Sequence, residues 1–347
     1  MSGQPVRSEA TGVPAMWIED GEKYALVGLS VKTDQDVRSG QVSEHLSVLS
    51  ETRFKIPDHW REWLGTIRTD NVRDCTLFLL SKLPTSTPDI LDEENNILKQ
   101  RVWNFYVGLL LASPFASSHE PVVLTGSRRG AEIDIRQHTD LLSPVPCVFR
   151  PYPAVASRDL KLAADLGEKL SLFPAAQVPG GHWRLFRTLD IYVKARTIGD
   201  IVDRLHQYCR CIDGLILPSA GETKKQFKSR TELFIGPRHH ELMGEIYDVR
   251  SAVEHLHENR YLEGFDREVR LDLLKKEAII EYVARKTLAK VIGTPAFWQH
   301  FGNTTALGQF WALDSDARKA IWGAPFDPLD AVADFNPAYI HNGLLGA

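Results

Sequence analysis

An arginine and a histidine five residues apart, Arg250 and His255, lie in the segment 244–255, which reads GEIYDVRSAVEH. Histidine accepts and returns a proton near neutral pH. Arginine keeps its charge and can stabilise a phosphate on which negative charge builds. RNA phosphodiester cleavage needs these two groups when no metal takes part, so the pair is the candidate catalytic site.

The spacing of this pair constrains how it could act. On a regular helix, residues five apart point about 140° away from each other. Either the helix is irregular here, or one phosphate is reached from two sides in a dimer cleft. Helical spacing aligns Arg250 with Glu254, and His255 with Ser251 and Asp248. We expect Glu254 to hold Arg250 and Asp248 to orient His255. The alternative is an Arg250–Glu254 pair on a solvated face, with His255 merely packing.

The composition is typical of a soluble globular protein. The chain has 347 residues, 43% hydrophobic and 25% charged, enough for a sizeable core in one or two domains. The formal net charge of −4 argues against a general electrostatic coating of nucleic acid and leaves room for local basic sites. The segments 224–230 and 267–290 are the basic stretches where such a site is expected.

The sequence gives no sign of a membrane or secreted protein. No apolar run approaches the ~18 residues of a membrane span, and the N-terminus lacks an apolar signal-peptide core. Four scattered cysteines (Cys75, Cys147, Cys209, Cys211) do not form a disulfide framework. We therefore expect a cytoplasmic protein with no membrane partner.

The first part of the chain has a mixed pattern. Residues 25–31 read as a strand, a long helical stretch is expected from Thr87 and Pro88, and residues 121–135 read as a β-hairpin. A proline cluster at 144–153 then suggests a domain boundary.

Helical periodicity dominates beyond this boundary. Helices are expected at residues 183–196, 198–217, 224–235, 238–257 and 266–292, followed by two short helices and an aromatic tail. The predicted fold class is mostly α, a C-terminal helical bundle preceded by a smaller α+β domain. The domains are expected at 1–150, 155–295 and 296–347.

Four segments in order make this helical half resemble the HEPN superfamily, and most nearly its Apea-like branch of bacterial proteins. Residues 204–215 are similar to the first conserved helix, with Asp213 at its acidic position. Residues 227–233 are similar to the mid-domain segment that carries Arg230. Residues 246–255 match the R-x-x-x-x-H signature, and a long closing helix starts at Asp266.

The resemblance implies an antiparallel helical bundle that dimerises and brings both Arg/His pairs into one cleft. Active members are metal-independent endoribonucleases of toxins, anti-phage systems and RNA-processing enzymes. Inactive members bind RNA or serve as interaction modules. For this chain it implies RNA as substrate or ligand, a homodimer, and neither cofactor nor metal. Catalysis would fall to Arg250 and His255, with Ser251, Asp248, Glu254 and Arg230 in supporting or RNA-contacting roles.

Other motifs favour structural roles. His239 and His240 lack the i,i+4 spacing of a zinc helix, and Cys209 and Cys211 lack the two-residue gap of a zinc or redox motif. Residues 126–130 read as a hairpin turn rather than a phosphate loop, and residues 132–136 as alternating surface charges. The tail tryptophans are expected to fill grooves between helices rather than stack on bases.

Three functions remain open at this point. The first is a metal-independent endoribonuclease, possible in a defence or toxin context. The second is a non-catalytic HEPN module that binds RNA or a protein through the same cleft. In the third, the front domain is a sensor and the helical half is its effector.

Overall fold

The computed structural model describes residues 17–51, 53–145, 153–173, 182–255 and 266–336. The chain is mostly helical, as predicted. The helices are α1 (Trp60–Arg73), α2 (Glu93–Ala112), α3 (Ser157–Ser171), α4 (Trp183–Ala195), α5 (Ile201–Ile216), α6 (Thr223–Ile235), α7 (His240–Glu254), α8 (Arg267–Gly293), α9 (Trp298–Phe301), α10 (Thr304–Ala312) and α11 (Ser315–Trp322). The strands are β1 (Glu22–Leu29), β2 (Gly40–Gln41), β3 (Ser47–Ser50), β4 (Leu77–Pro84), β5 (Val122–Arg129), β6 (Glu132–Ile133) and β7 (Gln137–Asp140).

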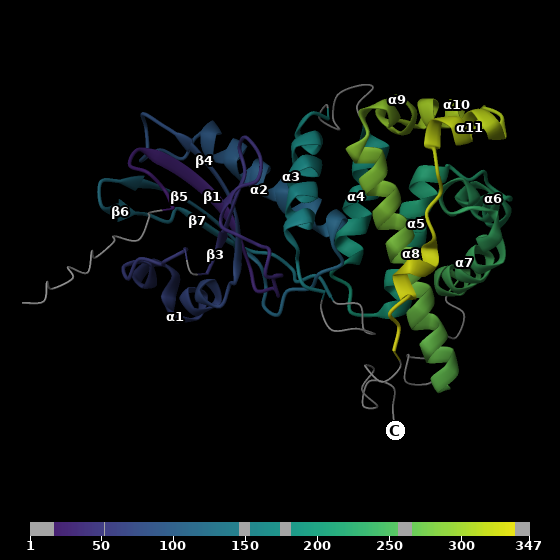
Figure 1. Ribbon diagram of the computed structural model, residues 1–347, viewed down its shortest axis with the longest axis horizontal. Helices are drawn as coiled ribbons and strands as arrows, with labels where there is room; N and C mark the ends of the chain where they lie inside the picture. Colours follow the sequence, from purple (N-terminus) through teal and green to yellow (C-terminus); the bar gives the residue numbers. More distant parts are fainter. Residues whose placement is uncertain (1–16, 52, 146–152, 174–181, 256–265, 337–347) are drawn as a thin grey trace, which may run out of the picture.

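The strands form one antiparallel sheet at one end of the molecule, and the later helices form the other end (Figure 1). The strand order is β2-β3-β4-β1-β5-β6, and β7 also pairs with β5. β1 is central, with Leu26 opposite Leu80 of β4 and Leu124 of β5. Every residue of β1 is buried, as expected for a central strand covered on both faces.

Successive side chains of β1 point into two different cores, because residues alternate across a strand. Ala25 and Val27 join the large core that contains α2, whereas Tyr24 and Leu26 join a smaller core that contains α1. The indole Nε1 of Trp60 in α1 donates a 2.7 Å hydrogen bond to a carbonyl oxygen of β6. The sheet is thus enclosed between two helical layers.

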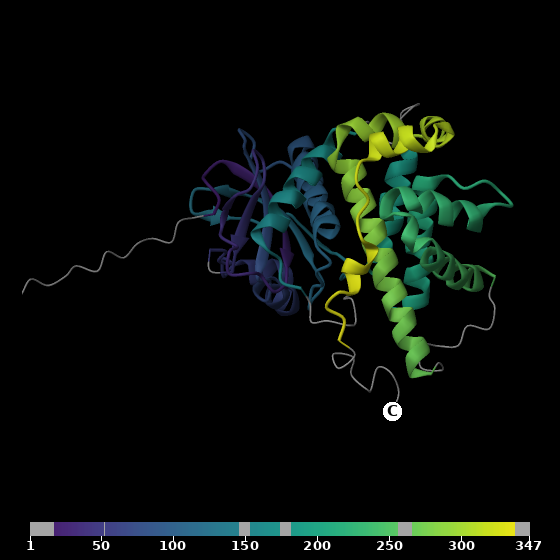
Figure 2. The ribbon, with the colours of Figure 1, turned by 45° about the vertical axis from the view of Figure 1, so that its right-hand side comes forward.

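Small residues let α2 and α3 approach closely. A Cβ atom added at Gly108 would lie 2.1 Å from the carbonyl oxygen of Ala163, and one at Gly167 would lie 3.0 Å from the backbone of Asn104. Figures 1 and 2 both show this helix pair between the sheet and the remaining helices. The pair therefore joins the two ends of the molecule.

One hydrophobic cluster continues through this junction. Its members come from the sheet, the α2–α3 pair and the helical half, for example Ala25, Leu79, Phe105, Ala163, Leu205 and Ile280. The described elements on either side of the proline cluster thus share a core. The division of the chain into three domains remains a prediction.

Several elements were placed correctly from the sequence. α4, α5, α6 and α8 begin and end within three residues of their predicted limits, and β5 and β6 form the predicted hairpin. Local capping explains part of this success, since the Asp200 carboxylate accepts hydrogen bonds from the Val202 and Asp203 N–H groups at the start of α5.

Other boundaries were wrong. The predicted helix start at Thr87 is replaced by α2 beginning at Glu93, because Asp92 caps the helix and accepts from the Glu94 N–H. The sequence reading omitted α1 and α3, and three short helices (α9, α10, α11) stand where two were expected. The predicted helix at 238–257 begins with a 3-10 turn and its α-helical part ends at Glu254; residues 256–257 lie outside the described residues.

Candidate functional site

The α7 helix positions the candidate arginine. Met243, Ile246 and Tyr247 of this helix are buried, as their helical spacing predicts. Arg250 follows Tyr247 by three residues, so its side chain lies at the margin of the buried face. Its guanidinium carbon lies 5.1 Å from the centroid of the Tyr247 ring, and the side chain keeps 16% of its surface exposed. The guanidinium therefore packs on the Tyr247 ring and remains partly exposed to solvent.

Two carboxylates hold this guanidinium. Its Nη1 lies 2.6 Å from Oε2 of Glu254, one turn further along α7, and its Nη2 lies 3.5 Å from Oδ2 of Asp213 on α5. The Nε of Arg250 is buried and has no hydrogen-bond acceptor among the described residues. The expected Arg250–Glu254 contact is therefore present, and Asp213 of α5 lies beside the arginine.

Asp213 lies in an unusual environment for a carboxylate. Its pKa is raised to about 6, mainly by burial; Arg250 opposes the shift and Glu254 adds to it. Its Oδ1 is buried without a hydrogen-bond partner in the described part of the chain. Asp213 is thus a carboxylate that Arg250 helps to keep ionised at neutral pH.

His255 lies just beyond the last turn of α7. Its N–H donates to the carbonyl oxygen of Ser251 at 3.1 Å, its φ and ψ are −90° and 10°, and the residue is exposed. The regular helix therefore ends just before the histidine, and the dimer cleft that could also explain the Arg/His spacing stays a prediction. Ser251 itself is half-buried on α7.

A second histidine, His206, lies beside the cluster and was missed from the sequence. Its Nε2 is 3.4 Å from Oε2 of Glu254, and burial lowers its pKa while Glu254 opposes the shift. His206 and Asp213 are seven residues apart, two turns of α5, so they share one helix face. That spacing was the available signal. The lowered pKa favours the neutral imidazole of His206.

Two of the predicted supporting residues have other partners. Asp248 is paired with Lys224 of α6, whose Nζ lies 2.6 and 2.9 Å from the two carboxylate oxygens. The orientation of His255 by Asp248 stays a prediction. Arg230 donates 2.6 Å hydrogen bonds to the carbonyl oxygens of Ile216 and Leu217, at the end of α5. It stabilises a helix end, where Leu217 adopts a left-handed conformation, rather than pointing to the Arg250 cluster.

A buried layer of charges lies deeper in the helical half and was also missed. Nη2 of Arg204 lies 2.8 Å from Oε1 of Glu277, and both side chains are at most 3% exposed. Glu281, one turn further along α8, accepts from the Tyr192 hydroxyl at 2.8 Å and from Nε of Arg285 at 3.0 Å. These contacts join α4, α5 and α8. Their complete burial indicates a structural role.

Cys209, Cys211 and Trp311 pack in the core as expected, whereas residues 126–129, expected in a hairpin turn, belong to β5, and the Arg136 side chain, expected on the surface, is 11% exposed. Cys209 and Cys211 are buried thiols whose pKa is raised by burial. Asp134 forms an ion pair with Arg136 at 2.8 Å beside the hairpin. Trp311 is buried and its indole Nε1 donates to the carbonyl oxygen of Leu215, so it packs between helices.

The described ranges contain neither a metal-ligand cluster nor a membrane-spanning helix. His239 faces Asp327 and His240 faces Glu232, and those ranges hold no group of three His, Cys, Asp or Glu side chains suited to a metal ion. None of the helices in them combines the length and hydropathy that a membrane span requires.

Comparison with known proteins identifies no relative. No family model and no curated protein matches the sequence, and no solved structure matches the fold.

Proposed function

We propose that the protein is a cytoplasmic, homodimeric endoribonuclease of HEPN type that cleaves RNA without a metal, using Arg250 and His255. The observation that carries the proposal is the setting of Arg250. Its guanidinium is held over Tyr247 by Asp213 from a different helix, and His255 follows at the exposed end of α7. A fixed cation and an exposed imidazole at one end of the same helix are the groups that this chemistry requires.

In the proposed reaction, the His255 imidazole removes the proton of a ribose 2′-hydroxyl group. The hydroxyl oxygen attacks the adjacent phosphorus, and Arg250 stabilises the charge that develops on the phosphorane. A second His255, from the partner protomer, or water returns a proton to the leaving 5′-oxygen. The products carry a 2′,3′-cyclic phosphate and a 5′-hydroxyl group, and DNA is not cleaved because it lacks the 2′-hydroxyl group.

The two carboxylates beside Arg250 need different roles in this mechanism. Glu254 is 45% exposed, so it can turn away when a phosphate arrives. Asp213 is 18% exposed and belongs to α5, so it can stay and hold the guanidinium in place. Arginine has five N–H donors and can therefore bind a phosphate oxygen while it remains paired with one carboxylate.

A homodimer is supported by the position of α7. This helix lies with α6 at the edge of the helical half that is remote from the sheet (Figures 1 and 2). An edge helix can meet its copy about a two-fold axis, which would place two Arg250/His255 pairs in one cleft.

A specific observation favours a second candidate, a non-catalytic module that binds RNA or a protein partner. Two carboxylates already pair with Arg250, which lowers its capacity to stabilise the additional negative charge of a phosphorane. In this case RNA would bind without being cleaved.

The decisive experiment incubates purified protein with mixed-sequence RNA in EDTA and identifies the product ends. Wild-type protein should leave cyclic-phosphate ends, and His255→Ala should lose about 10²–10⁴-fold in rate. The matched control is His119→Ala, because His119 is an exposed histidine in the sheet-containing half. Equal cleavage by the wild type and His255→Ala would refute the assigned base. RNA binding without cleavage by the wild type would establish the second candidate.

A further inference from the structure

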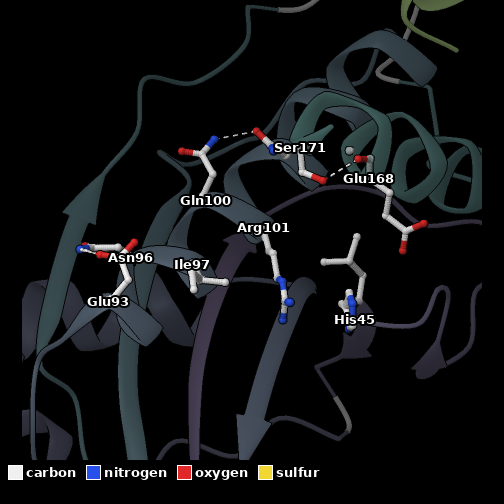
Figure 3. A pocket seen from close by; sticks show the side chains of 11 residues that line it. His45, Glu93, Asn96, Ile97, Gln100, Arg101, Glu168 and Ser171 are labelled. Atoms are coloured by element: carbon white, nitrogen blue, oxygen red, sulfur yellow. Dashed lines mark hydrogen bonds between the residues drawn. The ribbon is translucent and has the colours of Figure 1, made fainter. Parts of the chain in front are cut away.

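A hollow of about 520 Å³ lies between α2, α3 and the turn that precedes β3. It has no residue in common with the Arg250 cluster. Figure 3 shows Ile97 and Arg101 entering from α2, Glu168 from α3, and His45 from the turn. The volume is within the range of small-molecule sites, roughly 300–1,000 Å³.

The hollow contains a cation, Arg101, for which the described part of the chain supplies no counter-ion. Arg101 is half-buried, and no carboxylate within the described ranges pairs with its guanidinium. Partly buried arginines normally have such a partner, because desolvating an unpaired charge is costly. In Figure 3 the guanidinium lies between Ile97 and His45, whose imidazole is 46% exposed on its side of the hollow. These two side chains can together receive an anionic group.

A carboxylate group on α3 supplies an acceptor. Oε1 of Glu168 is buried and lacks a hydrogen-bond partner among the residues described. Its position is fixed, because the preceding residue, Gly167, packs directly on the backbone of α2. By contrast, Gln100 donates to Oδ1 of Asn104 at 2.8 Å, so these two amides partly satisfy each other. Arg101 and Glu168 are therefore the groups left to bind something else.

The walls between the two charged groups are partly apolar. Ile97 is 41% exposed although it is a large aliphatic residue, and Leu46 also lines the hollow. We propose that this hollow binds a small organic molecule in which an apolar or aromatic body joins an anionic group to an N–H donor. Arg101 and His45 bind the anion, Ile97 and Leu46 contact the body, and Glu168 accepts from the N–H group.

Nucleoside monophosphates and aromatic amino acids both carry this combination of groups, and a binding experiment separates the two sources. Titration calorimetry of the full chain would use adenosine and guanosine 5′-monophosphates in one arm and L-tryptophan in the other. Inorganic phosphate and adenosine are the fragment controls. The ligand of one arm should bind at least about tenfold more tightly than inorganic phosphate or adenosine alone, since both its anionic group and its N–H donor contribute to binding.

Variants then assign the binding to this hollow. Arg101→Gln and Glu168→Gln should each weaken binding by about 10- to 100-fold, the loss expected for a charge-assisted hydrogen bond. Lys99→Gln is the matched control, because Lys99 is on the same helix and does not line the hollow; it should change affinity less than about twofold. Melting curves without ligand establish that each variant is folded.

Three results would overturn the proposal. The first is that no probe in either arm binds at millimolar concentration. The second is that inorganic phosphate binds as tightly as the organic probes, which would indicate a simple anion site. The third is that binding survives in both folded variants. None of these results depends on RNA cleavage, so the ribonuclease proposal is tested independently of this one.

Discussion

Arg250 on α7 and Asp213 on α5 lie 3.5 Å apart at the margin of the helical core, and the charge of Arg250 lowers the pKa of Asp213. Burial raises the pKa of Asp213 to about 6 from its ordinary value of 3.8, and Arg250 limits the shift. The contact joins two helices and places a guanidinium next to the exposed end of α7.

This pKa predicts how stability depends on pH. Between about pH 4 and pH 6 the folded protein retains a proton on Asp213 that the unfolded chain has lost. The contribution of Asp213 to the free energy of unfolding therefore falls as the pH rises. Asparagine mimics the protonated carboxyl group. The free energy of unfolding of Asp213→Asn, relative to the wild type, should therefore increase from pH 4 to pH 7, by at most about 3 kcal/mol. Urea denaturation at each pH measures the free energy of unfolding of both proteins. A difference between them that stays constant or decreases from pH 4 to pH 7 would contradict the raised pKa of Asp213.

The His206 pKa should respond to Glu254. Burial lowers that pKa, and the Glu254 carboxylate 3.4 Å away raises it, so Glu254→Gln should lower it further. Histidine ring signals followed by NMR from pH 4 to pH 8 would measure the change. Asp248→Asn is the control, because Asp248 pairs with Lys224 instead and should leave the His206 titration unchanged. A rise in the His206 pKa in Glu254→Gln would exclude the contact in solution.

The buried Arg204–Glu277 pair should be essential for stability. Arg204→Met leaves Glu277 in the core without its 2.8 Å partner, which should cost about 3–5 kcal/mol of unfolding free energy. Adding Glu277→Leu should recover most of this loss, because the unpaired charge is then removed. Lys319→Met, which breaks an exposed pair with Asp316, should change the free energy by less than about 0.5 kcal/mol. Equal losses of unfolding free energy in Arg204→Met and Lys319→Met would contradict the burial of the Arg204–Glu277 pair.

The close approach of α2 and α3 should not tolerate a methyl group. Gly108→Ala places a Cβ 2.1 Å from the Ala163 carbonyl oxygen, and we expect a loss of about 1–3 kcal/mol despite the higher helix propensity of alanine. Gly199→Ala is the matched control, since its added Cβ meets nothing within 4 Å. Thermal unfolding of the two variants compares them directly. A Gly108→Ala protein as stable as the wild type would mean that the helices can separate without cost.

Local sequence signals predicted much of the helical half. The apolar residues of α5 recur at helical spacing, and Asp200 caps its start, so a single segment contains the information needed to predict the helix. The Arg250–Glu254 contact was predictable for the same reason, because residues four apart meet on any helix. The β5–β6 hairpin likewise depends on a short turn with Gly130 at a φ of 60°.

Tertiary structure decided the rest. α3 depends on the fit of Gly167 against α2, and the neighbours of β1 come from distant segments, so neither follows from local spacing. The contact of His206 also does not follow from local spacing, because its partner Glu254 is 48 residues away. Periodicity determines which residues share a face of a helix, whereas the packing of the whole core determines which two faces meet. The sequence by itself therefore determined α4, α5, α6, α8 and the Arg250–Glu254 pair, and the tertiary structure alone brought Asp213 and His206 to that pair.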